Sequence, residues 1–412
     1  YFRIRFSLKT VLYISYDGMT DPLGQSQVLP YLKGLSSFGY NIHLISFEKS
    51  EKFKRYKKTI QSICDEGGIT WHPQDYSNEG GLKKTIRQVI KMKRVARYLH
   101  KKHHFEIIHC RSYISALVGL ELKRKHGVKF VFDMRGFWAD ERIDGGIWSL
   151  ENPIFKTIYK YFKKKEIQFF NESDYTVSLT ENGKNEIISW PKIRNDIKIK
   201  VIPCCVDLNL FNPNNIKIED QITAKENLKI TPENNIFGYV GSIGTWYMLS
   251  EMLDFFKEYL NHNPNAIFLF VTGEKEETII KAVKEKNIDP NSIRVKSVLH
   301  SEVPLYISLF HKSIFFIRST YSKKASSPTK QGEIMAMGIP LICNAGVGDT
   351  DLVVKKYNAG IVLNEMNEAH YKNAINSESN LDIELIKKGA KEYFSLTEGT
   401  QRYLSIYQEI YE

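Results

Sequence analysis

The sequence predicts an α/β protein with two doubly wound domains, each a parallel sheet covered by helices on both faces. Three observations lead to this prediction. Short apolar runs typical of buried strands alternate with longer amphipathic segments along most of the chain. The length of 412 residues exceeds that of an ordinary single domain. A polar stretch at residues 212–235, interpreted as a surface connection, separates two such series of elements.

The first series of elements occupies the first part of the chain. In order, we expect a strand at 11–15, a helix at 26–38 ended by Gly39, a strand at 41–47, helices at 51–66 and 82–102, a strand at 105–109, a helix at 112–125 and a strand at 128–133. Because helices separate these strands, the strands should run parallel in one sheet.

The second series repeats the pattern. Its expected strands are 236–240, 266–272, 293–296, 314–317, 341–344 and 360–363, and a short helix should begin near Gln331 and end at Gly338. We place the first domain at residues 1–203, the second at 204–395, and a last helix at 396–412 that packs back on the first domain. Ligands of open parallel sheets bind beyond the carboxyl ends of the strands. The two Rossmann-like domains are therefore expected to face each other across a cleft.

Charge is unevenly distributed. The net charge is +11, and residues 1–200 hold 36 Lys and Arg against 21 Asp and Glu. Such a basic half suits an anionic surface: a membrane, nucleic acid or a phosphorylated lipid. No apolar run approaches the length that spans a bilayer. The five cysteines form no CxxC pair and have no zinc spacing, which favours reduced thiols in the cytosol and no metal site.

Residues 326–340, SSPTKQGEIMAMGIP, are the most informative segment. The first turn of a helix offers backbone N–H groups and a positive dipole end, which favour an anion. Hydroxyl groups and a lysine suit a phosphate, and here they are Ser326, Ser327, Thr329 and Lys330. Glu333, one turn further, can accept hydrogen bonds from ribose hydroxyls. Phosphate and ribose together indicate a nucleotide; the alternative is any doubly wound domain with a tight turn.

Residues 333–340, EIMAMGIP, resemble the donor-binding helix of family 4 glycosyltransferases of the GT-B fold, in which the Glu holds the nucleotide ribose. Residues 21–27, DPLGQSQ, resemble one bacterial subgroup of that family. The resemblance implies a GT-B fold and hexosyl transfer, with retention, from a nucleotide-sugar donor to a glycan or lipid-linked acceptor. It implies no metal and no cofactor. Ala325 stands where the family usually has a sugar-contacting Glu, and Cys204-Cys205 replaces the usual Asn-Gly.

A glycine-containing loop, with Gly241, Ser242 and Gly244, follows the strand at 236–240. Glycine lets backbone approach a phosphate closely. The family usually supplies an Arg and a Lys from this region, but Ser242 and Met248 lie near those places here. The positive charge that stabilises the leaving phosphate is then expected from Lys330, and Arg318 is a further candidate.

In the first domain, Asp133 ends the strand at 128–133 and Arg135 follows it, and we place both with Lys330 among the catalytic residues. Asp133 would be the general base of an inverting reaction, or would orient the acceptor or stabilise positive charge in a retaining one. The alternative is an Asp133–Arg135 salt bridge that shapes a turn. His109 and Arg111 end a neighbouring strand.

The loop after the first strand contributes Gly18, Asp21, Gly24 and Gln25, which the resemblance places over the cleft. The alternative is a plain strand-to-helix loop capped by Ser26. The D-x-D string at 349–351 is interpreted as coincidental, so no metal is expected.

Two basic segments, residues 82–102 and 156–170, suggest a peripheral position at the cytoplasmic face of an anionic membrane, with aromatic insertion at Tyr159, Tyr161 or Phe162. The alternative is a solvated basic face over a core stripe that includes Leu82 and Ile86. The expected pathway is cell-surface polysaccharide or glycoconjugate synthesis. Two alternative hypotheses are that the protein is a nucleotide-sugar epimerase of GT-B architecture or a basic nucleic-acid-binding protein. No nucleic-acid motif is present, so nucleic acid is not an expected partner.

Overall fold

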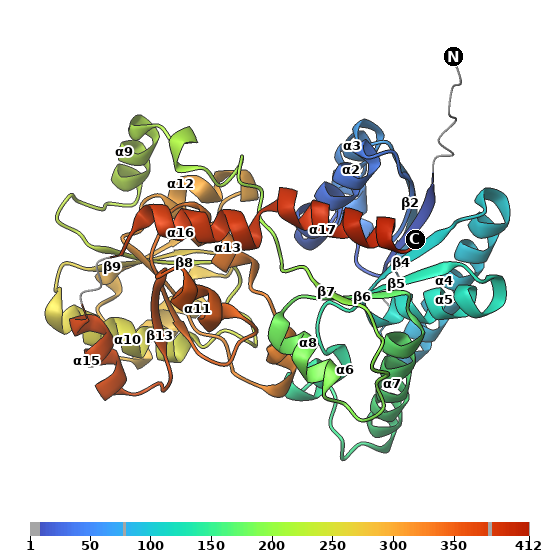
Figure 1. Ribbon diagram of the computed structural model, residues 1–412. Helices are drawn as coiled ribbons and strands as arrows, with labels where there is room; N and C mark the ends of the chain where they lie inside the picture. Colours follow the sequence, from blue (N-terminus) through green and yellow to red (C-terminus); the bar gives the residue numbers. More distant parts are fainter. Residues whose placement is uncertain (1–8, 77–79, 378–380, 412) are drawn as a thin grey trace. The chain divides into compact units, whose positions relative to one another are not determined.

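The computed structural model describes residues 9–76, 80–377 and 381–411. The chain divides into two compact units (Figure 1). Unit 1 comprises Tyr1–Pro203 and Leu396–Glu412, and unit 2 comprises Cys204–Ser395. Each unit is an α/β domain built on one parallel sheet, so the predicted fold class is confirmed.

The sheet of unit 1 has seven strands in the order β3-β2-β1-β4-β5-β6-β7. The strands are β1 (Thr10–Ser15), β2 (Asn41–Lys49), β3 (Ile69–Tyr76), β4 (Ile107–Arg111), β5 (Lys129–Asp133), β6 (Tyr175–Ser178) and β7 (Ile199–Val201). Strands β1, β4 and β5 lie at the centre, and nearly all of their residues are buried. The carboxyl ends of these three strands therefore form a rigid platform for side chains.

Helices cover both faces of this sheet. They are α1 (Pro22–Gln27), α2 (Leu29–Ser37), α3 (Ser50–Glu66), α4 (Leu82–His103), α5 (Ser112–His126), α6 (Trp138–Asp144), α7 (Pro153–Glu172), α8 (Glu181–Ile188) and α17 (Leu396–Glu409). Helices α4 and α7 both pack against α5. The last helix, α17, packs against α2, although the whole of unit 2 lies between them in sequence (Figure 1).

Unit 2 has six strands in the order β10-β9-β8-β11-β12-β13. The strands are β8 (Ile236–Val240), β9 (Ile267–Val271), β10 (Ile293–Lys296), β11 (Lys312–Phe315), β12 (Leu341–Asn344) and β13 (Gly360–Leu363). The α-helices are α9 (Ile218–Asn227), α10 (Leu249–His262), α11 (Glu276–Glu285), α12 (Val303–Ile307), α13 (Thr329–Ala336), α14 (Thr350–Lys356), α15 (Glu368–Asn376) and α16 (Ile383–Gly389). The described residues also include five short segments: η1 (Pro213–Asn215), η2 (Pro290–Ser292), η3 (His300–Glu302), η4 (Tyr321–Ala325) and the π-helical η5 (Ala390–Phe394).

Several elements differ from the sequence-based expectation. The helix expected at 26–38 is two helices, α1 and α2, which meet at Val28. The strand expected at 105–109 lies two residues later, at Ile107–Arg111. The stretch at 212–235, expected to be a plain connection, contains η1 and α9. Among the described residues, no helix is both long and apolar enough to cross a membrane.

Candidate active site

In unit 2, the start of α13 carries the residues expected to bind a nucleotide. The N-cap residue is Pro328, whose side chain cannot accept a hydrogen bond from the N–H groups of the first turn. The positive end of the helix dipole therefore lies where the sequence places the phosphates. Thr329 is the first helical residue, and Lys330 and Glu333 follow within the next turn.

Lys330 is buried between two tyrosines. Its Nζ donates a hydrogen bond to Tyr239 Oη at 2.8 Å. The same atom lies 4.0 Å from the ring centroid of Tyr239 and 3.7 Å from that of Tyr247. Burial lowers the pKa of Lys330 well below its ordinary value, and the charge of Glu333 opposes this only in part. The site therefore holds its cation in an environment that disfavours the charged form until an anion arrives.

The loop after β8 lies directly against this lysine. Gly241 has a φ of +104°, and a Cβ added there would lie 3.2 Å from Lys330 Nζ. Glycine at this position thus permits both the backbone conformation and the close approach. The structure brings together Gly241 and Lys330, two of the predicted donor-binding residues. Ser242 is exposed, its carbonyl accepts a hydrogen bond from Tyr239 Oη at 2.5 Å, and open space surrounds Gly244.

Glu333 has a partner that the sequence analysis did not identify. The side chain of Glu333 is 12% exposed, and its Oε1 lies 3.4 Å from Nε2 of His300 in η3. The hydrogen bond with Glu333 raises the pKa of His300. The ring of His300 packs 5.5 Å from that of Phe211. A carboxylate, an imidazole and an aromatic ring thus lie together one turn from Lys330.

The other predicted donor residues precede the same helix in sequence. Ser327 Oγ accepts a hydrogen bond from the Cys204 backbone N–H at 3.1 Å, and Ser326 follows η4. Arg318 is exposed, and its backbone N–H donates to Trp246. Lys323, which the sequence analysis missed, is buried with its Nζ 3.6 Å from the ring centroid of Trp246.

In unit 1, strand register aligns the predicted catalytic residues. Arg111 on β4 is the register partner of Ser15 on β1 and of Asp133 on β5. His109 on β4 lies two residues earlier, so its side chain faces the same side of the sheet. Two residues with left-handed φ follow the strand ends: Ser112 at +69° after β4, and Arg135 at +58° shortly after β5. Such conformations are uncommon for residues other than glycine and are often found at functional sites.

Asp133 is buried within a polar cluster. Its Oδ2 accepts a hydrogen bond from Tyr403 Oη at 3.0 Å and lies 3.8 Å from His109 Nε2. Its Oδ1 lies 3.8 Å from Arg135 Nη1 and has no hydrogen-bond partner among the described residues. His109 Nδ1 lies 2.8 Å from Tyr407 Oη. The salt bridge expected as an alternative is therefore present as a loose contact inside a larger cluster.

The charges of this cluster follow from its burial. Burial alone would raise the pKa of Asp133, but Arg135, His109 and Arg111 lower it below its ordinary value. Burial lowers the pKa of His109 despite the nearby carboxylate. At neutral pH the cluster therefore holds an ionised Asp133 and a neutral His109. Arg111 Nε lies 3.5 Å from Asp17 Oδ2, and the Asp17 side chain is half exposed.

A buried carboxylate shapes the loop that contains Gly18, Asp21, Gly24 and Gln25. Glu48, near the end of β2, accepts hydrogen bonds from the Met19 and Thr20 N–H groups at 2.8 and 3.0 Å. A Cβ on Gly24 would collide with the Gly18 carbonyl, so the loop is closely packed on itself. Asp21 pairs with Lys49 at 3.0 Å and Lys52 at 2.6 Å, and Gln25 Nε2 donates to the Thr20 carbonyl at 3.3 Å.

The residues that the sequence analysis did not identify each contact a site residue that is distant in sequence. Glu48 is a single acid in an apolar strand, and Tyr403 and Tyr407 are four residues apart on one face of a late helix. Each supports a residue that is distant in sequence. The i, i+4 spacing of two tyrosines with buried neighbours was the only sequence signal, and it is equally typical of a core stripe.

In the two basic segments, some apolar side chains are exposed and some aromatic side chains are covered, contrary to expectation. On α4, Leu82, Ile86 and Ile90 are 45%, 50% and 44% exposed, so Leu82 and Ile86 do not belong to the core stripe. On α7, Phe162 is buried against Trp138, and Tyr159 Oη donates to Asp140 at 2.8 Å. Of the three aromatic residues expected to insert into a membrane, Tyr161 alone is exposed.

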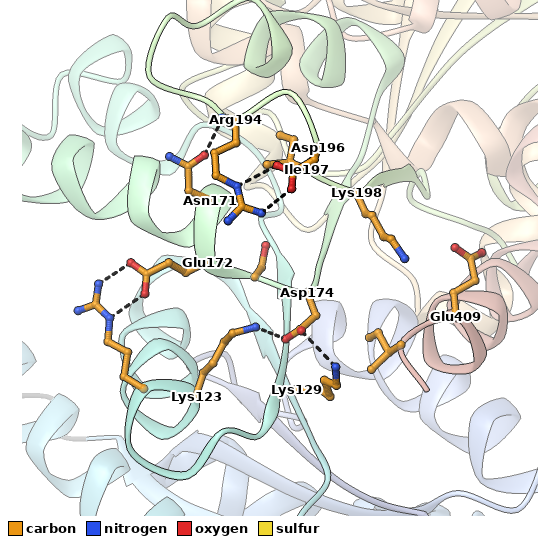
Figure 2. Close-up of a pocket in the computed structure, with 13 residues that line it drawn as sticks. Lys123, Lys129, Asn171, Glu172, Asp174, Arg194, Asp196, Ile197, Lys198 and Glu409 are labelled. Atoms are coloured by element: carbon orange, nitrogen blue, oxygen red, sulfur yellow. Dashed lines mark hydrogen bonds and ion pairs between the residues drawn. The ribbon is translucent and has the colours of Figure 1, made fainter. Parts of the chain in front are cut away.

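A cavity of about 600 Å³ lies at the opposite end of the same sheet. It is next to Lys129 at the start of β5, Asp174 just before β6 and Lys198 just before β7 (Figure 2). Its cations are largely paired with acids: Lys123 and Lys129 with Asp174 (Figure 2), and Arg124 with Glu172. Because it lies at the amino ends of the strands and its charges are neutralised locally, it is not part of the candidate active site.

Among the residues that the structure describes, no group of three or more His, Cys, Asp or Glu side chains could hold a metal ion. Asp349 of the D-x-D string is buried and accepts a hydrogen bond from Tyr393 Oη at 2.6 Å. All five cysteines are buried and none is in a disulfide.

Comparison with protein families identifies both halves of the chain. Residues 26–210 match the model for Glycosyltransferase Family 4, and residues 220–389 match the model for Glycosyl transferases group 1. Each part of the chain thus matches a glycosyltransferase model, which supports glycosyl transfer from a nucleotide-sugar. No curated protein sequence gave a significant match.

Solved structures share the fold at low sequence identity. Sucrose-phosphate synthase from Thermosynechococcus elongatus has a TM-score of 0.73 at 14% identity, over 98% of this chain and 99% of its own. A glycosyltransferase from Rickettsia africae has a TM-score of 0.73 at 16% identity, over 99% and 100%. HepE from Anabaena, solved in complex with UDP and glucose, has a TM-score of 0.70 at 12% identity, over 97% and 99%. The fold of this chain is that of GT-B glycosyltransferases.

Proposed function

We propose that this protein transfers a hexosyl group from a nucleotide-sugar to a glycan or lipid-linked acceptor, with retention of the anomeric configuration. The two glycosyltransferase domains support the class of reaction. One structural observation carries the proposal further: Lys330 lies against the backbone of Gly241, at the start of the helix that also presents Glu333. Phosphate and ribose recognition are thereby combined in one place.

Each donor-side residue has a role in this proposal. Glu333 accepts hydrogen bonds from the ribose hydroxyls, and Lys330 contacts the diphosphate. The loop with Gly241, Ser242 and Gly244 offers backbone N–H groups to the same phosphates, since it carries no Cβ at its closest point. As the glycosidic bond to the phosphate breaks, negative charge grows on the leaving oxygen. An ammonium group already in place stabilises that charge without reorganisation.

Asp133 acts on the acceptor side. Its carboxylate is ionised and buried, and one oxygen is without a hydrogen bond among the described residues. In a retaining reaction, the departing phosphate can take the acceptor proton, so Asp133 orients the acceptor or stabilises positive charge on the sugar. Arg135 and the neighbouring pair His109 and Arg111 hold that carboxylate ionised. No metal or other cofactor has a role in this scheme.

A screen of nucleotides tests the donor assignment. The protein is mixed with UDP, GDP, ADP and their sugar conjugates, and its melting temperature is measured. A ligand at about a hundred times its dissociation constant stabilises the folded state by roughly 2.7 kcal/mol, which is easily detected. Absence of a shift with every nucleotide would contradict the proposal. Turnover of a sugar nucleotide without any acceptor would instead support the epimerase alternative.

An assay of the product tests the reaction. With the donor identified, Asp133→Asn should leave nucleotide affinity unchanged and lower transfer by roughly 10²-fold or more. The anomeric configuration of the product, measured by NMR, decides between retention and inversion. Near-normal transfer with a lowered melting temperature would mean that Asp133 has a structural role only.

The proposed place of action is the cytoplasmic face of an anionic membrane, in the synthesis of cell-surface polysaccharide or glycoconjugate. Exposed apolar residues lie just before α7 and in its first turn. Ile147 and Leu150, before the helix, are 55% and 42% exposed, and Ile154, in its first turn, is 58% exposed. Lys156, Lys160 and Lys164 are exposed on the same helix. On α4 the exposed Leu82, Ile86 and Ile90 alternate with lysine and arginine. Since α4 and α7 both pack on α5, both surfaces lie on the same layer of unit 1. Exposed apolar side chains among basic ones suit the interface of an anionic bilayer.

A further inference from the structure

We propose that α17, the last helix of the chain, is part of the catalytic apparatus, with Tyr403 as the positioning residue for Asp133 and Tyr407 as that for His109. This inference rests on the proposed function, since it assumes that Asp133 acts in glycosyl transfer. The helix begins at Leu396, directly after the last residue of unit 2, and its side chains reach the strand ends of unit 1.

The contact between Tyr403 and Asp133 is specific. Tyr403 Oη donates to Asp133 Oδ2 at 3.0 Å, whereas the nearest atoms of His109 and Arg135 lie 3.8 Å from the carboxylate, beyond hydrogen-bond range. Among the described residues, the tyrosine is therefore the group that fixes the direction of this buried carboxylate. The second oxygen, Oδ1, is left without a hydrogen bond and is available to a ligand.

Tyr407 fixes the neighbouring imidazole. Its Oη lies 2.8 Å from His109 Nδ1. In the neutral ring, a proton on Nε2 faces Asp133, and Nδ1 then accepts a hydrogen bond from the tyrosine. The two tyrosines, four residues apart on one helix, thus set the carboxylate and the tautomer of the histidine together.

The two tyrosines are themselves held rigidly. The ring of Tyr403 lies 5.3 Å from that of Tyr31 and 5.4 Å from that of His109. The ring of Tyr407 lies 5.1 Å from that of Tyr40. Helix α17 also approaches α2 closely, because a Cβ on Gly34 would lie 2.5 Å from Thr400 Cγ2. A donor locked by packing on several sides can hold a catalytic group in one geometry at little entropic cost.

The helix makes another tyrosine contact that serves as a control. Tyr175 Oη on β6 donates to Glu409 of α17 at 2.9 Å, far along the helix from Asp133. Loss of that hydrogen bond loosens the attachment of α17 without removing any group from the cluster. Tyr175→Phe and Tyr403→Phe therefore separate a general loosening of the helix from the loss of one positioned donor.

The test combines kinetics with a double-mutant cycle. The full-length variants Tyr403→Phe, Asp133→Asn and their combination are compared with wild type and with Tyr175→Phe. We expect Tyr403→Phe to lower kcat by about 10-fold with the KM for the donor unchanged, since a misdirected carboxylate affects the reaction and not donor binding. Tyr175→Phe should leave kcat within about 2-fold of wild type. In the Asp133→Asn background, Tyr403→Phe should have no further effect.

The possible results separate this inference from the proposed function. Normal transfer by Asp133→Asn would show that the proposed role of Asp133 is wrong, and this inference would fall with it. Impaired transfer by Asp133→Asn with normal kcat in Tyr403→Phe would overturn the positioning role alone. An equal loss from Tyr403→Phe in the presence and absence of Asp133 would also overturn it. Circular dichroism and the melting temperature, measured on every variant, show whether unit 1 is folded, and calorimetry of nucleotide binding reports on unit 2.

Discussion

Replacement of Lys330 by methionine tests the donor site most directly, because the two expected effects have opposite signs. The substitution keeps the length of the side chain and removes its charge. We expect the nucleotide to bind more weakly while the free protein becomes as stable as wild type or more so. A residue with a purely structural role would not behave in this way.

The magnitudes follow from the surroundings of Lys330. Methionine forfeits one hydrogen bond to Tyr239, which contributes about 1 kcal/mol. It also loses the attraction of the ammonium to two tyrosine rings, at most about 2 kcal/mol. Against this, a buried ammonium costs several kcal/mol in lost hydration, of the same order or larger. For a domain of this size, a gain of about 1 kcal/mol would raise the melting temperature by roughly 2–4 °C.

The pH dependence has a definite sign. The pKa of Lys330 is lowered in the folded protein, so the unfolded chain binds more protons at pH values between the two pKa values. The destabilisation by Lys330 is therefore complete below the folded pKa and disappears as the pH rises toward the ordinary lysine value. The difference in melting temperature between Lys330→Met and wild type should accordingly shrink as the pH is raised.

The second measurement is the affinity of Lys330→Met for UDP, determined by calorimetry. A lost charge-assisted phosphate contact corresponds to about 1.5–3 kcal/mol, or roughly 10- to 150-fold in affinity. Lys286→Met, which removes an equal charge from a surface pair with Asp254 in the same unit, is the matched control and should change neither quantity. If Lys330→Met melts several degrees lower and binds nucleotide normally, the lysine is structural and the reasoning is wrong.

Three further results are expected. Glu333→Gln should weaken nucleotide binding by about 1.5–3 kcal/mol in calorimetry, and unchanged affinity would remove the ribose assignment. Binding of the protein to liposomes of graded anionic content should weaken at high salt. Replacement of Ile154 and Tyr161 by Ser should abolish the part of the binding that resists salt. Equal recovery on neutral liposomes would exclude electrostatic docking. Burial lowers the pKa of His43 to about 4, and the pKa of its partner His72, 3.0 Å away, is also lowered. The unfolded chain binds more protons, so the melting temperature should fall as the pH drops from about 6.5 toward 4, and His43→Gln should flatten that curve.

The sequence predicted the strands of unit 2 better than those of unit 1. Strands β8, β10, β12 and β13 have the predicted boundaries, whereas β3, β6 and β7 of unit 1 were not predicted. Strand β3 lies at a sheet edge and contains Pro73, and β7 at the other edge has three residues. Neither of these two strands is a continuous apolar run, so their composition resembles that of loops.

Some residues of the candidate site could be predicted from the sequence, and others could not. Lys330, Glu333 and the Gly241 loop could be predicted because a helix start after a glycine turn has a local pattern. His300, Tyr239 and Tyr403 could not, since each reaches its partner from a distant part of the chain. The exposure of Leu82 and Ile86 could not be predicted either, because periodicity shows which residues share a helix face but not whether another element packs on that face.

Both units hold a charged group in the same manner. In unit 2 an ammonium is buried against Tyr239 and Tyr247, and in unit 1 a carboxylate is buried against Tyr403. A tyrosine hydroxyl can accept from a cation or donate to an anion, and its ring excludes water. Among the described residues, neither charge has an ionic partner within hydrogen-bond distance, since His109 Nε2 and Arg135 Nη1 each lie 3.8 Å from a carboxylate oxygen of Asp133. Such an arrangement lowers stability in the free protein and leaves each charge free to act on the charge that develops during transfer. It follows that neutral isosteres at Lys330 should stabilise the protein while lowering its activity.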